Sequence, residues 1–422
     1  MITSELFSEA MGKLDPKYLD EMLGYQPKKK PKTVFVKYVA LAAVLCLVIA
    51  AAVWANWDDS GLSVDENDNP LGAVYEDDTV YSVDLPMLTV SLGDSGMGFE
   101  GYWVYDISDL VSGNPWNEDM ELSTLPVYQN VISYDDYHVP LSGVDYDKMS
   151  ELLYEVAGRL GLDTEALEIT DDAYSEERKQ SVIKSYEGSG YDIPDSYFDA
   201  TRYMCETDDY EIEVNTYLTV MVTFKNPVSV SDEIEDDPYA LAEYFLEEYS
   251  ELIDMENPTI SIDGGDRSIY GEQSFSIAFY ETTDDDTGNI LSYNFKKISF
   301  ICNSDGDLWM IDFFNVDLSD KIGDYPIITA DEATEMLAEG KYLTSAPVEF
   351  PGVEYIGKVE LIYRTGAYEE NFIPYYRFYV EIDPGYGDSF YTLGMTTYAA
   401  YYVPAISEEY ISDLTVWDGR FN

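Results

Sequence analysis

The sequence is poor in the residues that catalytic and metal sites most often use. It has one histidine, His138, and three cysteines among 422 residues. A Ser-His-Asp or Cys-His arrangement would have to use His138, and a histidine with satisfied hydrogen bonds at a strand end is the favoured interpretation of that residue. Metal sites of the His/Cys type are excluded by count. The sequence therefore predicts a protein that is not an enzyme and needs no cofactor.

Positive charge is also scarce, and its distribution is uneven. Of 23 Lys or Arg and 83 Asp or Glu in the whole chain, the first 57 residues hold 7 and 5, which leaves 16 against 78 for the rest. So strong a negative field repels nucleic acid and the anionic inner leaflet of a membrane. Disorder is not expected, because 46% of residues are hydrophobic and 15% are aromatic, which is ample material for a core.

A long uncharged apolar run dominates the N-terminal part. Residues 38–54 carry no charge, and the run extends to Trp57. About 20 helical residues cross the hydrocarbon core of a bilayer. Tyr38, Trp54 and Trp57 stand at the ends, where amphipathic rings favour the headgroup region. We therefore predict a transmembrane helix over residues 38–57 that lies in the lipid bilayer; a buried core helix is the alternative.

The flanking charges predict the orientation. Five lysines precede the run within residues 28–37, and five Asp or Glu follow it within residues 58–68. The positive-inside rule then places the N-terminus in the cytoplasm and the chain from residue 58 outside the cell membrane. A cleaved signal peptide with Val53 and Ala55 at the −3 and −1 positions is the alternative. The bulky Trp54 between them and the long N-terminal region argue against cleavage.

Two short amphipathic helices are predicted before the lysine-rich linker. Ser4 can cap the first, and Asp15-Pro16 starts the second with aspartate at the N-cap and proline at the first helical position. A segment this short cannot build a stable core, so its apolar side chains must bind the membrane surface or a protein partner; a passive tail is the alternative. The predicted partner-binding residues are Leu6, Phe7, Met11, Tyr18, Leu19, Met22 and Leu23.

Beyond the span, the pattern predicts an α+β fold of tandem extracytoplasmic units, each a helix packed on an antiparallel sheet. Helices are expected at Tyr146–Gly161, from Pro238 onward behind an Asp237 cap, and at Ala330–Glu339 behind a Thr329 cap. The predicted division is 1–37 cytoplasmic helical segment and basic linker, 38–57 transmembrane helix, 58–120 acidic stalk with strands, and three α+β units at 121–230, 231–325 and 326–422. The stalk is expected to join the edge of the first unit.

Strands are expected where apolar and polar residues alternate with a period of two. In Tyr375–Ile382 the pattern places Tyr376, Phe378, Val380 and Ile382 on one face. A hairpin turn is expected at Asn303–Asp307. The predicted strands are 125–132, 200–206, 210–215, 217–224, 259–262, 273–280, 290–302, 308–314, 355–363, 375–382 and 398–403.

Two further features leave alternatives open. Cys205 and Cys302 lie in the predicted outer region, where they form one disulfide or remain two free thiols. Residues 65–69, 284–289 and 303–307 resemble calcium loops in composition, but none has the EF-hand spacing. A tight turn explains the last of these more simply than a bound ion does.

Two parts of the chain resemble known families. The stretch SELFSEAMGKLDPKYLDEML, followed by lysines and a Cys-containing apolar span, resembles single-pass envelope proteins of Gram-positive Clostridia, some of them similar to anti-sigma factors. The stretches TADEATEMLAEGKY, KVELIYR, IPYYRFYVEI and YYVPAI resemble the YycI-type regulators. Those are bitopic proteins with outer α+β repeats that restrain a cell-wall sensor kinase. Residues 1–36 lack His and Cys, so the zinc clamp of classical anti-sigma domains is excluded.

The sequence thus predicts a non-enzymatic, membrane-anchored regulator. Its outer domain would sense or bind an envelope ligand, and its inner helix would dock a sigma factor or sensor kinase. The alternative is a structural or adhesive envelope module with a passive cytoplasmic tail.

Overall fold

The computed structural model describes residues 85–90, 99–188, 190–231, 233–268, 270–383, 394–414 and 416–417. All of them belong to one unit of the chain, Tyr81–Asn422. The predicted cytoplasmic helices and the predicted transmembrane helix at residues 38–57 lie outside the described residues. None of the helices in the described ranges is long and apolar enough to span a membrane.

The described part is α+β, as the sequence predicts. It contains six α-helices and eighteen strands, and the ladders between these strands are antiparallel. The strands form sheets of eight, five, three and two strands.

The largest sheet has the strand order β5-β6-β7-β8-β12-β11-β10-β9. Its central pair is β8 and β12, with Val222 opposite Ile311. One continuous sheet therefore contains strands from both sides of residue 230, where the sequence pattern places a boundary between two units. The strand bounds are β5 (Thr170–Asp171), β6 (Arg202–Glu206), β7 (Tyr210–Asn215), β8 (Val220–Val228), β9 (Pro258–Arg267), β10 (Gln273–Glu281), β11 (Lys296–Cys302) and β12 (Leu308–Asn315).

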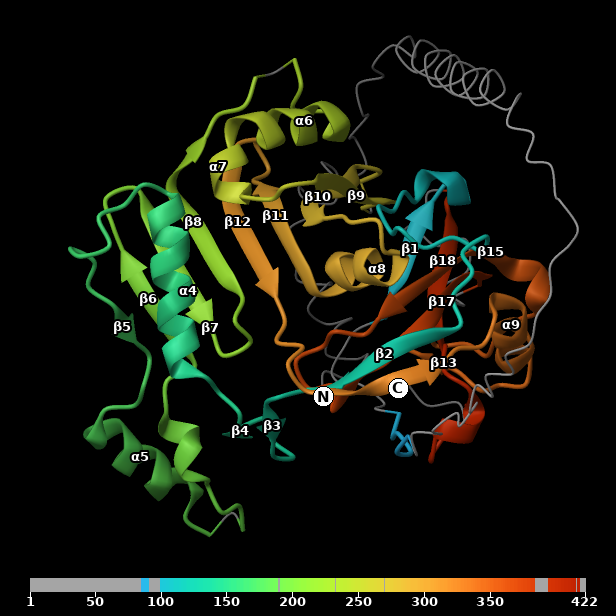
Figure 1. Ribbon diagram of the computed structural model, residues 1–422, viewed down its shortest axis with the longest axis horizontal. Coiled ribbons are helices and arrows are strands. Elements are labelled where there is room, and N and C mark those ends of the chain that lie inside the picture. The colour runs from blue at the N-terminus through green and yellow to red at the C-terminus, as the bar shows by residue number, and fades with distance from the viewer. Residues whose placement is uncertain are drawn as a thin grey trace, which may run out of the picture. The chain divides into compact units, whose positions relative to one another are not determined.

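Helices cover one face of this sheet (Figure 1). Helix α4 (Tyr146–Arg159) packs on β6, β7 and β8, and its N-cap Asp145 accepts a hydrogen bond from the Lys148 backbone N–H at 2.9 Å. Helix α6 (Pro238–Glu248) packs on β9 and β10 and is followed by the short α7 (Ser250–Ile253). The predicted α4 and the Asp237 cap of α6 are confirmed.

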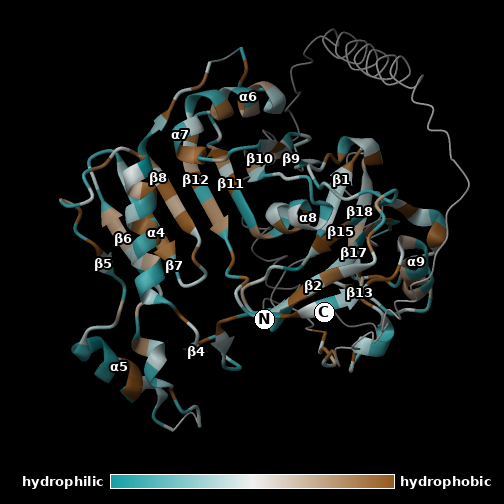
Figure 2. Ribbon diagram, viewed as in Figure 1, coloured by the Kyte–Doolittle hydropathy of each residue, from teal (hydrophilic) through white to brown (hydrophobic). Residues whose placement is uncertain are grey.

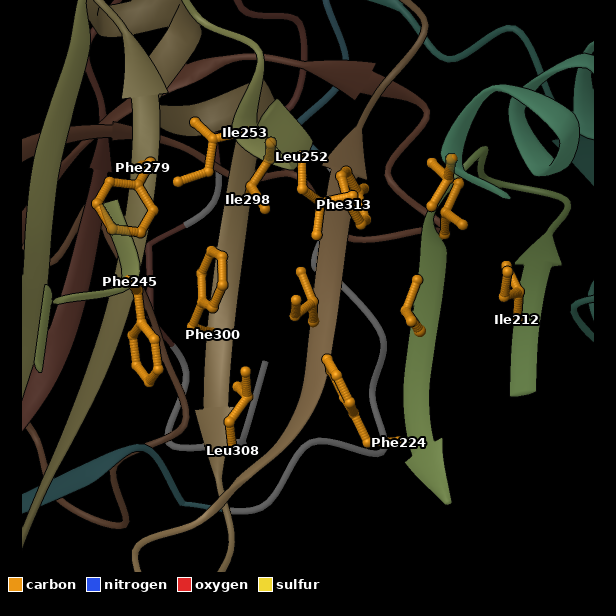
Figure 3. Packing of buried hydrophobic residues seen from close by; sticks show 14 of the residues in the cluster. Ile212, Phe224, Phe245, Leu252, Ile253, Phe279, Ile298, Phe300, Leu308 and Phe313 are labelled. Carbon is orange, nitrogen blue, oxygen red and sulfur yellow. The ribbon is translucent and has the colours of Figure 1, made fainter. Parts of the chain in front are cut away.

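The core between this helix layer and the sheet is apolar. Figure 3 shows Ile298, Phe300 and Phe313 on the strands, with Phe245 approaching from α6. The rings of Phe245 and Phe300 stack with centroids 4.9 Å apart. Figure 2 shows that hydrophobic residues run along β8, β11 and β12. Alternation with a period of two puts these residues on the covered face.

The second large sheet has the order β1-β18-β17-β15, with β14 also paired to β18. Tyr376, Phe378, Val380 and Ile382 of β17 share one apolar cluster, which confirms the predicted face. The opposite face is covered too, because Tyr375 and Tyr379 belong to two further clusters. The bounds are β1 (Gly101–Val104), β14 (Leu343–Thr344), β15 (Ile356–Tyr363), β17 (Pro374–Ile382) and β18 (Thr396–Pro404).

Helix α9 (Ala330–Ala338) contacts β18, and a capping box starts it as predicted. Thr329 Oγ1 accepts from the Glu332 backbone N–H at 3.2 Å, and the Glu332 carboxylate accepts from the Thr329 N–H at 2.8 Å. This exchange satisfies two N–H groups at the helix start.

Two small sheets complete the described part. The three-stranded sheet has the order β13-β2-β16, and the two-stranded sheet pairs β3 with β4. The bounds are β2 (Thr124–Gln129), β3 (Ser133–Tyr134), β4 (Pro140–Ser142), β13 (Lys321–Pro326) and β16 (Asn371–Phe372). Helix α5 (Glu176–Tyr186) was not predicted and buries none of its residues. Short 3₁₀ turns are η1 (Ile107–Asp109), η2 (Asp195–Phe198), η3 (Val353–Tyr355) and η4 (Glu408–Tyr410).

One predicted strand is partly wrong. Residues 290–302 were expected to form a single strand, but Asp286–Phe295 is helix α8 and only Lys296–Cys302 is β11. Asp285 caps α8 by accepting from the Gly288 N–H at 2.8 Å. Ile290 and Phe295 of α8 are buried in the core of the second large sheet, so tertiary packing overrides the strand-like composition.

The described part of the stalk region contacts both large sheets, since β1 pairs with β18 and Val111 forms a bridge with Gly264 of the edge strand β9. A second predicted strand is shorter in the structure. The strand expected at 217–224 begins only at Val220, because residues 216–219 form the turn that joins β7 and β8.

Candidate functional site

The site residues predicted from the sequence lie outside the described part of the chain. The structure therefore does not place the predicted partner-binding residues Leu6, Phe7, Met11, Tyr18, Leu19, Met22 and Leu23, nor the predicted membrane-anchor residues Tyr38, Trp54 and Trp57. The candidate site described below belongs to the part expected outside the membrane.

A cavity of about 170 Å³ lies where four loop segments meet. These segments are residues 130–132 after β2, the β7–β8 turn at 216–219, residues 314–317 at the end of β12, and residues 365–367 before β16. The cavity thus joins the eight-stranded sheet to the three-stranded sheet, and we refer to it as the junction cavity. Its walls are mostly apolar.

The β7–β8 turn forms one wall and has an unusual backbone. Asn215 Oδ1 accepts from the N–H groups of Tyr217 at 3.0 Å and Thr219 at 3.2 Å. This Asx arrangement holds Leu218 in the left-handed region, with φ of 62°. A leucine rarely adopts that conformation, and strained backbone of this kind is often found at functional sites.

Loops 130–132 and 365–367 are tied together on another side of the cavity. Asn130 Nδ2 donates to the Ala367 carbonyl at 2.9 Å and to the Glu369 carbonyl at 3.0 Å. Asn130 Oδ1 accepts from the Ile132 N–H at 3.0 Å. One side chain therefore fixes two loops that are more than two hundred positions apart in the chain.

An aromatic cluster lies beside the same turn. The Tyr217 ring stacks on Tyr134, with centroids 6.0 Å apart, and Tyr368 packs edge-on to Tyr134 at 5.0 Å. The only histidine of the chain, His138, stacks on Tyr368 at 3.9 Å. His138 lies in the turn between β3 and β4, with φ of 62°. Burial raises the pKa of Tyr217, so its hydroxyl stays protonated.

The charge that lines the junction cavity is negative. Asp145 and Asp317 are its only ionisable side chains other than Tyr217, among the described lining residues. Asp145 is exposed, and Asp317 is half-buried. Each carboxylate also supports local structure, since Asp145 caps α4 and Asp317 accepts from the Ser319 N–H at 2.8 Å. The arrangement suits binding of a group that is apolar and close to positive charge.

A second cavity, of about 290 Å³, lies between α4 and α7 over the ends of β11 and β12. Both signs of charge line it, and Arg159 on its α4 wall is already paired. Arg159 Nη2 lies 2.6 Å from Glu155 and 3.6 Å from Asp254. This pairing leaves the second cavity without a clear preference for a ligand charge.

A row of buried and half-buried charged and phenolic groups crosses the second large sheet. Glu360 of β15, Arg377 of β17 and Tyr402 of β18 are consecutive cross-strand neighbours. The Glu360 carboxylate contacts the Arg377 guanidinium, lies 2.8 Å from Lys358 Nζ and accepts from the Tyr379 hydroxyl at 3.0 Å. Burial raises the pKa of Glu360, but the charges of Arg377 and Lys358 outweigh it and lower that pKa to about 2.

The eight-stranded sheet has a contrasting carboxyl group at Asp312 of β12. Its Oδ1 atom is buried and accepts no hydrogen bond from the described residues. Burial raises the pKa of Asp312 to about 6, against a smaller lowering by Lys297. The charge of Lys297 therefore offsets only part of the desolvation penalty of this side chain.

The cysteines and the calcium-like loop at 303–307 have structural explanations, whereas the loop at 65–69 lies outside the described residues. Cys205 and Cys302 are both free, and burial raises the pKa of each thiol. Asn303 Oδ1 accepts from the Asp305 and Asp307 N–H groups, and the backbone of Asn303 donates to that of Asp307. The predicted hairpin turn is confirmed. The described residues contain no group of three or more His, Cys, Asp or Glu that could hold a metal ion.

Comparison with known proteins assigns no family to the chain. No family model matches it, and no curated protein matches it. Among solved structures, the C-terminal domain of YpeB from Bacillus megaterium is similar over 57% of this chain and 88% of that chain, at 12% identity and a TM-score of 0.24. A similarity this distant carries no argument about function. The resemblance to anti-sigma-like and YycI-type proteins stays a prediction.

Sequence reasoning missed the junction cavity and its aromatic cluster. Asn215 followed by Thr-Tyr-Leu-Thr, between two alternating runs, is a turn signal that could have separated β7 from β8. No comparable signal connects that turn to residues 130–132 or 365–367. Their meeting depends on how the sheets pack.

Proposed function

We propose that this protein is a single-pass membrane regulator that binds an envelope ligand or partner outside the cell membrane and a sigma factor or sensor kinase inside it. The described α+β part, with its antiparallel sheets, would belong to the outer domain. Residues 38–57 would span the bilayer. The apolar run and the opposite charges on its two sides support this topology.

The observation that carries the binding role is the junction cavity. Residues from four loops line it, Asn130 holds two of the loops together, and the strained Leu218 forms part of its wall. A pocket whose walls are fixed before binding loses little conformational entropy when it is filled. The described part is therefore well suited to recognition.

The inner helices supply the second half of the proposal. Leu19 and Met22 lie on the apolar side of the second predicted helix, which has no core of its own to cover. Exposed apolar stripes of this kind dock into grooves of partner proteins. The resemblance to anti-sigma-like envelope proteins points to the same role.

The test is affinity capture from membranes with the tagged full chain. We expect one stoichiometric sigma factor or sensor kinase to be captured with the native chain and lost with Leu19→Asp plus Met22→Asp. A matched control, Lys13→Ala plus Glu21→Ala, changes two charged residues of the same region and should retain the partner. Equal capture of the partner by the Leu19/Met22 variant would favour the structural envelope module. Unchanged localisation and function of the chain after deletion of residues 2–24 would favour it as well.

A further inference from the structure

We propose that the junction cavity receives one apolar side chain of a polypeptide partner whose neighbouring residues are Lys or Arg. Asp145 and Asp317 would pair with those basic residues at the mouth of the cavity. This inference rests on the proposed function in one respect, namely that the outer part of the chain binds a partner.

The size of the cavity favours a single side chain over a whole small molecule. Pockets for drug-sized ligands have volumes of roughly 300–1,000 Å³. A cavity of about 150 Å³ lined by apolar residues holds one benzene molecule. At about 170 Å³, the junction cavity has room for a leucine, isoleucine or phenylalanine side chain.

The walls favour an apolar occupant. Ile132, Leu218 and Phe372 line the cavity and are themselves more than nine-tenths buried, with exposures of 6%, 8% and 3%. Asn130 contributes little free polar capacity, because its amide already donates to two carbonyls and accepts from one N–H group. Filling such a space removes apolar surface from water on both partners, worth roughly 25 cal/mol per Å².

The charges favour basic neighbours of that apolar group. The described residues that line the cavity include Asp145 and Asp317 but no Lys, Arg or His. A carboxylate offers about four acceptor positions, so the backbone N–H that each one already accepts leaves room for an ammonium or guanidinium group. The net charge of −60 adds a long-range attraction for a cationic partner and repels an anionic one.

The rigidity of the site favours a docking pocket over an accidental packing defect. The Asx turn at Asn215 and the bridge made by Asn130 hold three of the four lining loops. The cluster of Tyr134, Tyr217 and Tyr368 supports the β7–β8 turn. Defects in cores usually collapse in part, whereas these loops are held apart by their own hydrogen bonds.

The experiment measures peptide binding to the full chain in detergent micelles by fluorescence anisotropy. The probe is a labelled nine-residue Gly/Ser peptide with a central Lys-Leu-Lys. Comparison peptides carry Lys-Ala-Lys or Glu-Leu-Glu at the same place. We expect the Lys-Leu-Lys peptide to bind at least tenfold more tightly than either, and its affinity to fall as salt concentration rises.

Two variants test the site itself. Asp145→Asn plus Asp317→Asn removes both charges while asparagine keeps the capping role, and Ala367→Leu fills the cavity. Each should weaken binding of the Lys-Leu-Lys peptide about tenfold or more. The control Asp208→Asn plus Asp284→Asn removes the same charge away from the cavity and should bind like the native chain. Thermal unfolding of each variant checks that it is folded.

The outcomes separate this inference from the proposed function. Equal binding of the Lys-Leu-Lys and Lys-Ala-Lys peptides, or unchanged binding by the Asp145/Asp317 variant, would overturn the inference. If that happened while Leu19→Asp plus Met22→Asp still abolished partner capture, the proposed regulator would stand with a different outer ligand. If peptide binding followed the expected order and no cytoplasmic partner were captured, the cavity would serve an envelope module.

Discussion

The two large sheets of this protein differ in how deeply their ion pairs are buried. The eight-stranded sheet has one apolar face under α4 and α6, and its ion pairs are near the surface, such as Arg202 with Glu213 at 3.2 Å. The second large sheet is covered on both faces, and it buries Glu360 between Arg377 and Lys358. Where a sheet face is solvated, as around Arg202 and Glu213, charges can stay in water, whereas a buried charge such as Glu360 needs partners. Asp312 is the exception in the eight-stranded sheet, because one of its carboxylate oxygens is buried without a hydrogen bond from the described residues.

The strands of the second large sheet hold eight tyrosines, against three in the strands of the eight-stranded sheet. In the second sheet, hydroxyl groups complete the buried network: Tyr379 donates to Glu360, and Tyr402 donates to Glu100 at 2.7 Å. A phenylalanine at either position would remove one of these hydrogen bonds to a carboxylate. Buried tyrosines there therefore supply both apolar area and hydrogen bonds.

The largest effect on stability is expected from Glu360→Gln. Removing one partner of a buried ion pair leaves the other charge uncompensated, which typically costs about 3–5 kcal/mol. The free energy of unfolding of the full chain, measured with denaturant, should fall by that amount. The control Glu213→Gln breaks a pair whose arginine side chain is 47% exposed, and it should cost about 0–1 kcal/mol.

The contribution of Glu360 to the free energy of unfolding should depend on pH. The pKa of Glu360 is lowered to about 2, below its ordinary value of 4.5, so the charged form stabilises the native state. This contribution is complete above about pH 4.5 and is lost as the pH falls toward 2. Glu360→Gln should lack that loss. Equal losses for the Glu360 and Glu213 variants would contradict the contrast between the sheets.

A smaller effect of opposite sign is expected from Asp312→Asn. The pKa of Asp312 is raised from 3.8 to about 6, so ionisation destabilises the native state, and stability is lost as the pH rises from about 4 to 6. At pH 7 the asparagine variant should be more stable by about 1–3 kcal/mol. At pH 3.5 the two chains should be similar. If the native chain were more stable than the Asp312→Asn variant at pH 7, the ionised carboxylate would be stabilising, and this prediction would be wrong.

The smallest effect is expected at the helix caps, and it should be the same beside both sheets. Thr329→Ala removes the cap of α9, and Asp237→Ala removes that of α6. Each should lower the free energy of unfolding by about 1 kcal/mol. Thr329→Ser and Asp237→Asn retain a capping oxygen and should stay within about 0.5 kcal/mol of the native chain. Unequal costs would show that the two helices contribute differently to their cores.

Sequence reasoning succeeded where a local signal carries the structure. Asp237-Pro238 and the Thr329/Glu332 pair mark helix starts, because the cap and its target lie within one turn. The alternation in β17 predicted its apolar face, since side-chain direction in a strand follows from the period alone. These features need no information about distant parts of the chain.

The failures have a common cause. Residues 290–295 read as strand but form part of α8, because Ile290 and Phe295 are buried against strands that follow them by many residues. The junction cavity was not predicted at all, because residues 130–132 and 365–367 are brought together by long-range contacts, the pairing of β2 with β16 and the hydrogen bonds of Asn130, which no local pattern reveals. The predicted partner-binding residues lie outside the described part, so that prediction stays open.

The sequence by itself determined the α+β class, the helix starts at Asp237 and Thr329, and the hairpin at Asn303–Asp307, since each depends on interactions within a few residues. Only the tertiary structure decided that strands on both sides of residue 230 form one sheet, that β1 pairs with β18, and that four distant loops enclose a cavity. These arrangements depend on which apolar faces cover one another, and many pairings of such faces satisfy the same alternating pattern.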